Sequence, residues 1–287
     1  MTTRYLRFSL GLLLFIQSAI ILTGGGVRLT GSGLGCPTWP ECTPGSYRPV
    51  VGQAEGSFHS WIEFGNRLLT FALLLASIIA IIAVLKTGRK DLRTLVLLQL
   101  LGIFGQGILG GITVLTNLNP IPVAGHFLLS IALVAAGITL YQQHNRKFIK
   151  IEKISLFARL HLLFAIAVIV LGTMVTGTGP HAGDWQAPRF PFKIQTIARI
   201  HADAVIIFLI LTVAYYFLGK LSEETKRLIR ILGFISIAQG ALGFVQYYQG
   251  VPPLLVGIHQ LGSILVWIAA WRIWLSTSRS STPISLG

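Results

Sequence analysis

Three histidines of this chain, His126, His201 and His259, lie near the beginning of long apolar segments. Histidine is a frequent metal ligand and a standard axial ligand of haem iron. His126 and His259 each follow a Gln-Gly-x-Leu-Gly motif, and in both cases the histidine comes 20 residues after the glutamine, Gln106 or Gln239. This repeated spacing predicts a duplicated unit that places a metal-capable side chain at equivalent points of two halves.

The two halves differ in the partner that each histidine is expected to meet. His201 and His259 are predicted to face each other across a four-helix bundle and to bind one iron as axial ligands, because bundles build cofactor sites from facing helices. The alternative is a hydrogen bond between helices, the more common role of a lone membrane histidine. In the first half Asn66 takes the position of His201, and an amide is a poor iron ligand. The sequence therefore predicts a closed, symmetric cofactor site in the second half and an open reaction site in the first.

Charged residues inside membrane segments are costly and are functional candidates by default. Glu63, Asn66 and Arg67 lie at the start of the second apolar segment, where they are expected to share the catalytic site with His126. Glu63 is a candidate for handling protons or positioning a substrate, and its alternative role is an ion pair with Arg67, four residues along the helix. Arg28 and Arg199 are candidates to pair with the propionates of a haem cofactor, or else with lipid headgroups.

Eight apolar segments must position these residues. The chain is 53% hydrophobic and 11% charged, with a mean hydropathy of +0.73, and a run of about 20 apolar residues spans a bilayer as a helix. The predicted fold is an all-α integral membrane protein with eight transmembrane helices as two parallel four-helix-bundle repeats, residues 1–145 and 146–287. The segments are 6–27, 60–85, 95–115, 123–141, 160–176, 200–218, 229–247 and 255–275.

The distribution of positive charge explains the net charge of +14 without a nucleic-acid partner. With the N-terminus in the cytoplasm, only six of the 23 lysines and arginines fall on the outer side, which leaves 17 inside. This asymmetry predicts a membrane protein with both termini cytoplasmic. The stretches 142–155 and 276–287 are expected to be short polar connectors, with no separate soluble domain. The six outer residues are Arg28, Arg48, Arg67, Arg189, Lys193 and Arg199.

The only two cysteines, Cys36 and Cys42, lie in the first outer loop. A disulfide can persist in an exported loop, and this one would close a small ring. Two roles stay open for the pair, a staple of the loop or a redox-active or ligand-handling pair. Zinc binding is not expected, since two cysteines do not complete a tetrahedral site.

Together these features resemble the haem A synthase family, the bacterial relatives of a mitochondrial enzyme of cytochrome oxidase assembly. The resemblance covers nearly the whole chain and is carried by the glycine-rich run 25–34, the cysteine pair, the Glu-Phe-Gly-Asn-Arg motif 63–67 and the three histidines. It implies oxidation of the C8 methyl of haem O to a formyl group, giving haem A for terminal oxidases. It also implies a haem b cofactor on His201 and His259, haem O as substrate near His126 and Glu63, and a disulfide in the outer loop.

The family pattern usually has histidine where this chain has Asn66. Two interpretations stay open: a variant that uses His126 alone and leaves the other face of the iron open, or a chain impaired at this step. The intact Glu63 and Arg67 favour the first. The resemblance further implies an unidentified electron donor, delivery of haem O by haem O synthase and contact with the lipid bilayer. It is also compatible with a homo-oligomer.

Two other classes of protein fit part of the pattern. A di-haem b-type electron carrier linked to quinol would need two ligands at each haem, and Asn66 counts against it. A transporter with parallel repeats would need no histidines at matched depth.

Overall fold

The structure, a computed structural model, describes residues 3–283. Within this range eight helices are long and apolar enough to cross a membrane, and each predicted segment lies inside one of them. This confirms a multi-pass, all-α membrane protein. The helices are α1 (Thr3–Leu29), α2 (Ser57–Lys86), α3 (Lys90–Leu115), α4 (Pro120–Gln142), α5 (Leu156–Thr178), α6 (Ile194–Leu218), α7 (Glu223–Tyr248) and α8 (Pro253–Ser278).

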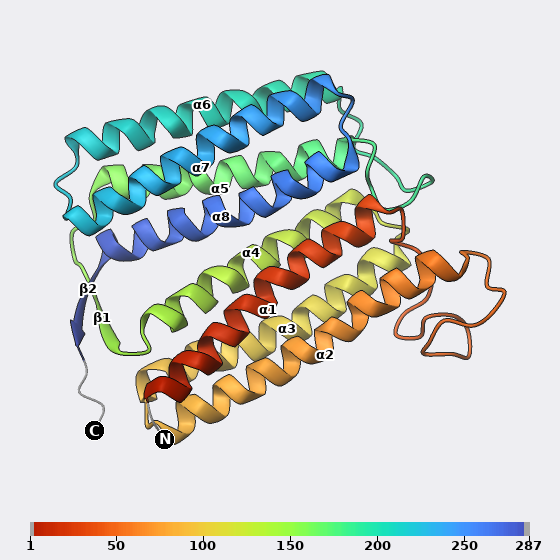
Figure 1. Cartoon of the computed structure of the whole chain (residues 1–287), viewed down its shortest axis with the longest axis horizontal. Coiled ribbons are helices and arrows are strands. Elements are labelled where there is room, and N and C mark those ends of the chain that lie inside the picture. The colour runs from red at the N-terminus through yellow and green to blue at the C-terminus, as the bar shows by residue number, and fades with distance from the viewer. Residues whose placement is uncertain (1–2, 284–287) are drawn as a thin grey trace.

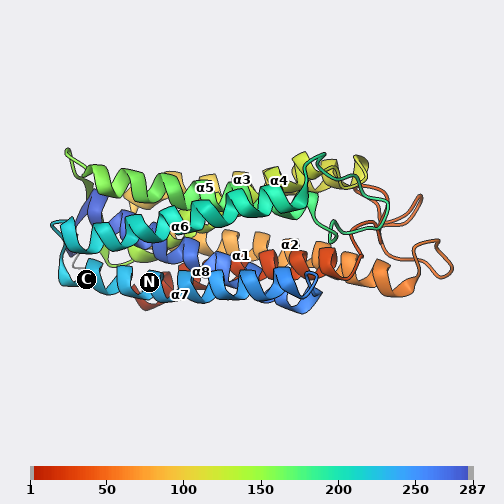
Figure 2. The ribbon, with the colours of Figure 1, turned by 90° about the horizontal axis from the view of Figure 1, so that it is seen from above.

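The helices form two bundles of four that lie side by side, α1–α4 and α5–α8 (Figure 1). In each bundle consecutive helices pack together and the first also packs on the fourth. As a result α2 lies diagonally across from α4, and α6 from α8. The bundles meet through α4 with α8, α1 with α8 and α4 with α5, so the contacts of one half have counterparts in the other. Seen from above, the helices run along a common direction, and the loop after α1 projects beyond one end (Figure 2).

Local sequence signals fix several helix starts. Asn119 caps α4, since its side chain accepts a hydrogen bond from the Ile121 amide, and Pro120 follows it in the first turn. Ser155 and Ser222 cap α5 and α7 by accepting from the amides of Ala158 and Thr225. These caps satisfy backbone donors that the membrane would otherwise leave without partners.

The interface between the halves is apolar, with a few buried hydrogen bonds. The indole nitrogen of Trp267 donates to the Ile131 carbonyl at 2.8 Å, which ties α8 to α4. The Gln260 amide donates to the Ile21 carbonyl at 2.8 Å and lies where a Cβ on Gly25 would be. A side chain at position 25 would therefore separate α1 from α8.

The prediction of plain connectors at 142–155 and 276–287 was wrong in one respect. Strand β1 (Arg146–Lys150) pairs antiparallel with β2 (Arg279–Pro283) and ties the link between the halves to the end of α8. Backbone groups beyond a helix end still need partners, and these two short segments supply them for each other. The last part of the predicted connector, 284–287, lies outside the described residues.

Candidate functional site

The sequence placed the polar site residues near one end of the molecule, and the fold agrees. Helices α2, α4, α6 and α8 all begin at the end that carries the cysteine loop (Figure 1). Asn66, His126, His201 and His259 lie within the first three turns of these four helices. The matched depth that the sequence predicted therefore holds in both halves.

Each of the three histidines rests against a glycine of a neighbouring helix. The Cε1 atom of His126 lies 3.5 Å from the point where a Cβ on Gly110 would be, and His259 has the same relation to Gly243. His201 lies at 3.5 Å from the corresponding point on Gly172. The glycines thus form cradles for imidazole rings. From the sequence, these glycines were expected to serve helix packing or to make room for a flat ligand. The sequence also held a signal for the contact with the histidines, since Gly110 and Gly243 both precede their histidine by 16 residues.

The three imidazoles share a second property. Among residues 3–283, the Nδ1 atoms of His126, His201 and His259 are buried and have no hydrogen-bond partner. A buried polar atom without a partner costs about 1–3 kcal/mol, so three equivalent cases call for an explanation. A metal supplies a partner only to the ring nitrogen that it binds, so ligation through Nδ1 would account for these atoms.

His201 and His259 form a pair across the second bundle. They are carried by the diagonal helices α6 and α8, at similar distances from the starts of those helices. Within the described residues no three histidine, cysteine, aspartate or glutamate side chains gather into a metal site. Two imidazoles on diagonal helices of one bundle suit an iron whose remaining ligands come from a macrocycle, so these residues fit a haem.

Asn66 in the first bundle takes a position like that of His201. Its side chain nitrogen lies 3.8 Å from the Cβ point of Gly24 on α1, as His201 lies against Gly172 on α5. The Thr23 hydroxyl donates to Asn66 Oδ1 at 2.7 Å. The amide is therefore held against α1, a contact that the sequence pattern did not indicate.

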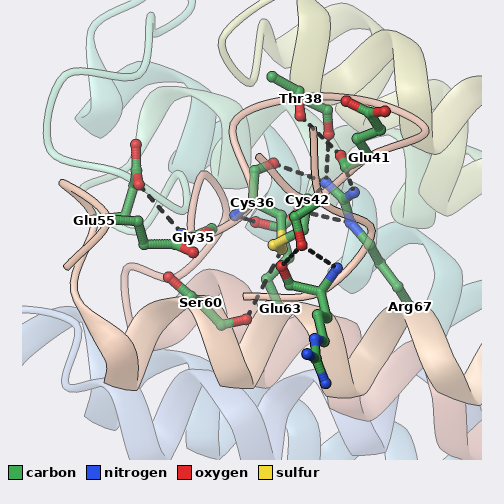
Figure 3. Close-up of a disulfide and its surroundings, with 12 residues drawn as sticks. Gly35, Cys36, Thr38, Glu41, Cys42, Glu55, Ser60, Glu63 and Arg67 are labelled. Carbon is green, nitrogen blue, oxygen red and sulfur yellow. Dashed lines mark hydrogen bonds and ion pairs between the residues drawn. A yellow bond between two sulfur atoms is a disulfide. The ribbon is translucent and has the colours of Figure 1, made fainter. Parts of the chain in front are cut away.

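The Glu63–Arg67 ion pair is present, with Arg67 Nη2 2.7 Å from Glu63 Oε1. Both residues also hold the outer loop (Figure 3). Glu63 Oε2 accepts from the Cys36 amide at 2.7 Å, while Arg67 donates to the carbonyls of Cys36, Thr38 and Glu41 at 2.7–3.0 Å. The structure therefore supports the ion-pair role of Glu63 and adds a role as anchor of the loop.

The loop that these contacts hold is closed by a disulfide between Cys36 and Cys42, both of which are fully buried. Inside the ring, the indole of Trp39 packs on Gly111 of α3, leaving no room for a Cβ there. Gly111 follows Gly110, the cradle of His126. The disulfide loop thus reaches the wall of the first bundle beside His126, which the sequence did not indicate.

The two arginines proposed as cofactor partners have different surroundings. Arg28 donates to the His181 carbonyl at 2.6 Å and so connects the end of α1 to the loop before α6. Arg199 is exposed on α6. Arg28 retains other donors, and Arg199 remains a candidate at the outer rim of the second bundle.

The repeated glutamines differ in their contacts. The Gln106 amide donates to the His126 carbonyl at 3.1 Å and to Ser130 Oγ at 2.6 Å, so it braces the first turns of α4. Gln239 instead packs into the space left by Gly262. The two copies of the motif therefore lie at corresponding places in the two bundles, but their glutamine side chains make different contacts.

The glycine cradles lead to a direct prediction. Gly243→Ala is expected to preserve haem binding by the second bundle, because its Cβ would meet His259 at an ordinary van der Waals distance of 3.5 Å. Gly243→Leu is expected to displace the imidazole and lower haem content at least about tenfold, as overpacking forces side chains off their rotamers. Absorbance of the purified variants measures this. Equal haem content in both would contradict the cradle.

Comparison with known proteins gives a consistent result. Residues 7–271 match the family described as cytochrome oxidase assembly protein. A protein named heme A synthase from Shewanella oneidensis is 25% identical over 329 aligned positions, which cover 96% of this chain and 99% of the relative. Proteins of the same name from Rhizobium leguminosarum bv. trifolii and Listeria welshimeri are 24% and 22% identical, covering 98% and 97% of this chain and 93% and 97% of their own lengths. The chain therefore belongs to the cytochrome oxidase assembly protein family.

Proposed function

We propose that this protein is a haem A synthase, which oxidises the C8 methyl group of haem O to a formyl group for terminal oxidase assembly. The observation that carries the proposal is the set of three buried imidazoles with unpartnered Nδ1 atoms, each against a glycine, two in one bundle and one in the other. The names of the full-length relatives support the same activity.

The two halves are assigned different tasks. Residues 146–287 hold a haem b cofactor through His201 and His259, and residues 1–145 accept haem O with His126 as iron ligand. Bound haem supplies an iron that accepts and passes on electrons. The apolar bundles keep water from the reacting groups, and Arg28 and Arg199 lie near the outer end, where they can pair with propionates.

Glu63 and Arg67 are assigned to the reaction site through the loop that they hold. Their contacts with Cys36, Thr38 and Glu41 keep the disulfide loop, and with it Trp39, against the first bundle. In this way the pair shapes the space beside His126. Asn66 completes the site on α2, with its amide held against α1.

The excess of basic residues on the terminal side supports a bacterial cell-membrane location with both termini in the cytoplasm and the disulfide loop outside. Haem O is itself membrane-soluble, and haem O synthase is the proposed source of this substrate. Conversion of a methyl to a formyl group removes four electrons from the carbon and adds one oxygen atom, so the reaction needs an oxidant and an oxygen source as well as the proposed external electron donor. A homo-oligomer is compatible with this arrangement.

One experiment tests the function against its rivals. The protein is expressed with and without a source of haem O, and the extracted pigments are identified. Formation of haem A only when haem O is supplied supports the proposal. Two stable b haems without haem A would indicate an electron carrier, and a colourless protein would indicate a transporter.

Glu63→Gln is expected to lower haem A yield and to let haem O or a hydroxylated intermediate accumulate. Glutamine can still accept from the Cys36 amide but removes the charge opposite Arg67. Glu41→Gln is a matched control, since the Glu41 carboxylate lies in the same loop and, within the described residues, accepts only from the exposed Gly45 amide. Unchanged haem A yield in Glu63→Gln would remove Glu63 from the reaction site.

A further inference from the structure

Asn66 is the point at which the two bundles differ most in chemistry. In the second bundle a glycine of the first helix, Gly172, cradles an imidazole of the second helix, His201. In the first bundle Asn66 of the second helix likewise contacts a glycine of the first helix, with its Nδ2 atom 3.8 Å from the Cβ point of Gly24. The backbone plan for a second iron ligand is therefore present in the first bundle, but the side chain at that place is an amide.

An amide at this place changes what the protein offers to an iron. The lone pair of an amide nitrogen is delocalised, so the nitrogen is a hydrogen-bond donor and not a ligand. The amide oxygen of Asn66 is already engaged, because the Thr23 hydroxyl donates to it at 2.7 Å. Thr23 thereby occupies the oxygen of the amide. The remaining polar group of the side chain is its NH2 group, which carries two N–H donors.

We propose, building on the function above, that His126 is the only protein ligand to the iron of haem O in this chain. Thr23 is a positioning residue that turns the Asn66 amide so that its N–H group faces the iron position that the protein leaves unligated. The second bundle, with His201 and His259, has no such open position. The polarity and hydrogen-bond donors of a distal pocket decide what a haem iron can bind, so this difference separates a reacting haem from an electron-transferring one.

Carbon monoxide is a suitable probe because it needs an open position on ferrous iron. The full-length protein loaded with haem O is expected to bind carbon monoxide at one of its two haems. Asn66→His is expected to supply the missing ligand, to convert that haem to a low-spin, six-coordinate spectrum and to lower carbon monoxide binding at least about tenfold. The spectrum of the haem in the second bundle checks that the variant has folded.

Thr23 is tested by a matched pair of variants. Thr23→Ser retains the hydroxyl and is expected to leave the carbon monoxide stretching frequency unchanged. Thr23→Val has a similar shape without the donor and is expected to shift that frequency toward the value of Asn66→Leu, because the amide is no longer held. A purely structural role of Thr23 would leave the frequency in place.

The outcomes separate this inference from the proposed function. Haem A production together with a haem O complex that binds no carbon monoxide would overturn one-sided ligation and leave the function standing. Full carbon monoxide binding by Asn66→His would overturn the assigned position of Asn66. An identical stretching frequency in wild type and Asn66→Leu would overturn the donor role. Failure of the wild-type protein to bind haem O would overturn both the function and this inference.

Discussion

His201→Ala and His259→Ala are each expected to abolish binding of the haem in the second bundle, whereas His126→Ala is expected to leave that haem in place. The reason is the separation of the imidazoles. His201 and His259 are carried by α6 and α8, diagonal helices of one bundle, and His126 is carried by α4 of the other bundle. Each has its own glycine cradle, so loss of one ring does not disturb the other site.

The three variants are also expected to differ in activity. Loss of a residue that merely supports a metal ligand typically costs 10- to 100-fold in affinity or activity, so loss of a ligand should lower haem A formation at least about 100-fold. All three variants should therefore fail to make haem A, but only His126→Ala should do so while still carrying haem b.

Pigment analysis of protein from cells without haem O measures the resident haem directly. His144→Ala serves as the control, because His144 lies just beyond α4 at the opposite end and its ring contacts the Tyr141 carbonyl. Haem b in His259→Ala, or its loss from His126→Ala, would contradict the assignment of the haem cofactor to the second bundle and of the substrate to the first.

The sequence predicted the helices and the depth of the histidines well, and the reason is the membrane. A bilayer admits few backbone conformations, so an apolar run of sufficient length predicts a transmembrane helix. Successive helices cross the bilayer in alternating directions, so the direction of each helix follows from its place in the chain. Once the direction is known, His126, His201 and His259 must lie near one end. The equal spacing from Gln106 and Gln239 then gave the duplication.

The contacts outside the helices could not be predicted in this way. The Cys36 amide meets Glu63 because of the path of an irregular loop, and no periodicity describes that path. The pairing of β1 with β2 joins segments far apart in the sequence through backbone groups. Side-chain patterns give no information about such backbone pairing. The cradles at Gly110 and Gly243 depend on which face of each helix meets its neighbour, and helices that are apolar on all sides give little indication of that.

Arg67→Leu is expected to open the disulfide loop. Arg67 donates to three loop carbonyls and pairs with Glu63, whose side chain is only 8% exposed. Leucine would leave that carboxylate without a countercharge and the carbonyls without their donor. Breaking a buried pair by removing one partner costs about 3 kcal/mol, and here the cost falls on the closed state of the loop.

Reduction of the disulfide measures this opening, because Cys36 and Cys42 are fully buried and a water-soluble reductant must wait for the loop to open. A cost of about 3 kcal/mol corresponds to a reduction rate about 100-fold higher than in the wild type, since each 1.4 kcal/mol is a factor of ten. Thiol labelling after timed exposure gives the rate. The reduction rate of Arg67→Lys should fall between those of the wild type and Arg67→Leu, because an ammonium keeps the charge but lacks the planar guanidinium that reaches several carbonyls.

Lys226→Leu is the matched control for loss of an ion pair. Lys226 pairs with Glu223 at 3.0 Å on α7, where the glutamate is 81% exposed, and such pairs contribute at most about 1 kcal/mol. This variant should leave the reduction rate unchanged. If Arg67→Leu also retains the wild-type rate while keeping the haem of the second bundle, the hydrogen bonds from Arg67 do not hold the loop closed. The contacts of Glu63 with the Cys36 amide and of Trp39 with Gly111 would then suffice to hold it.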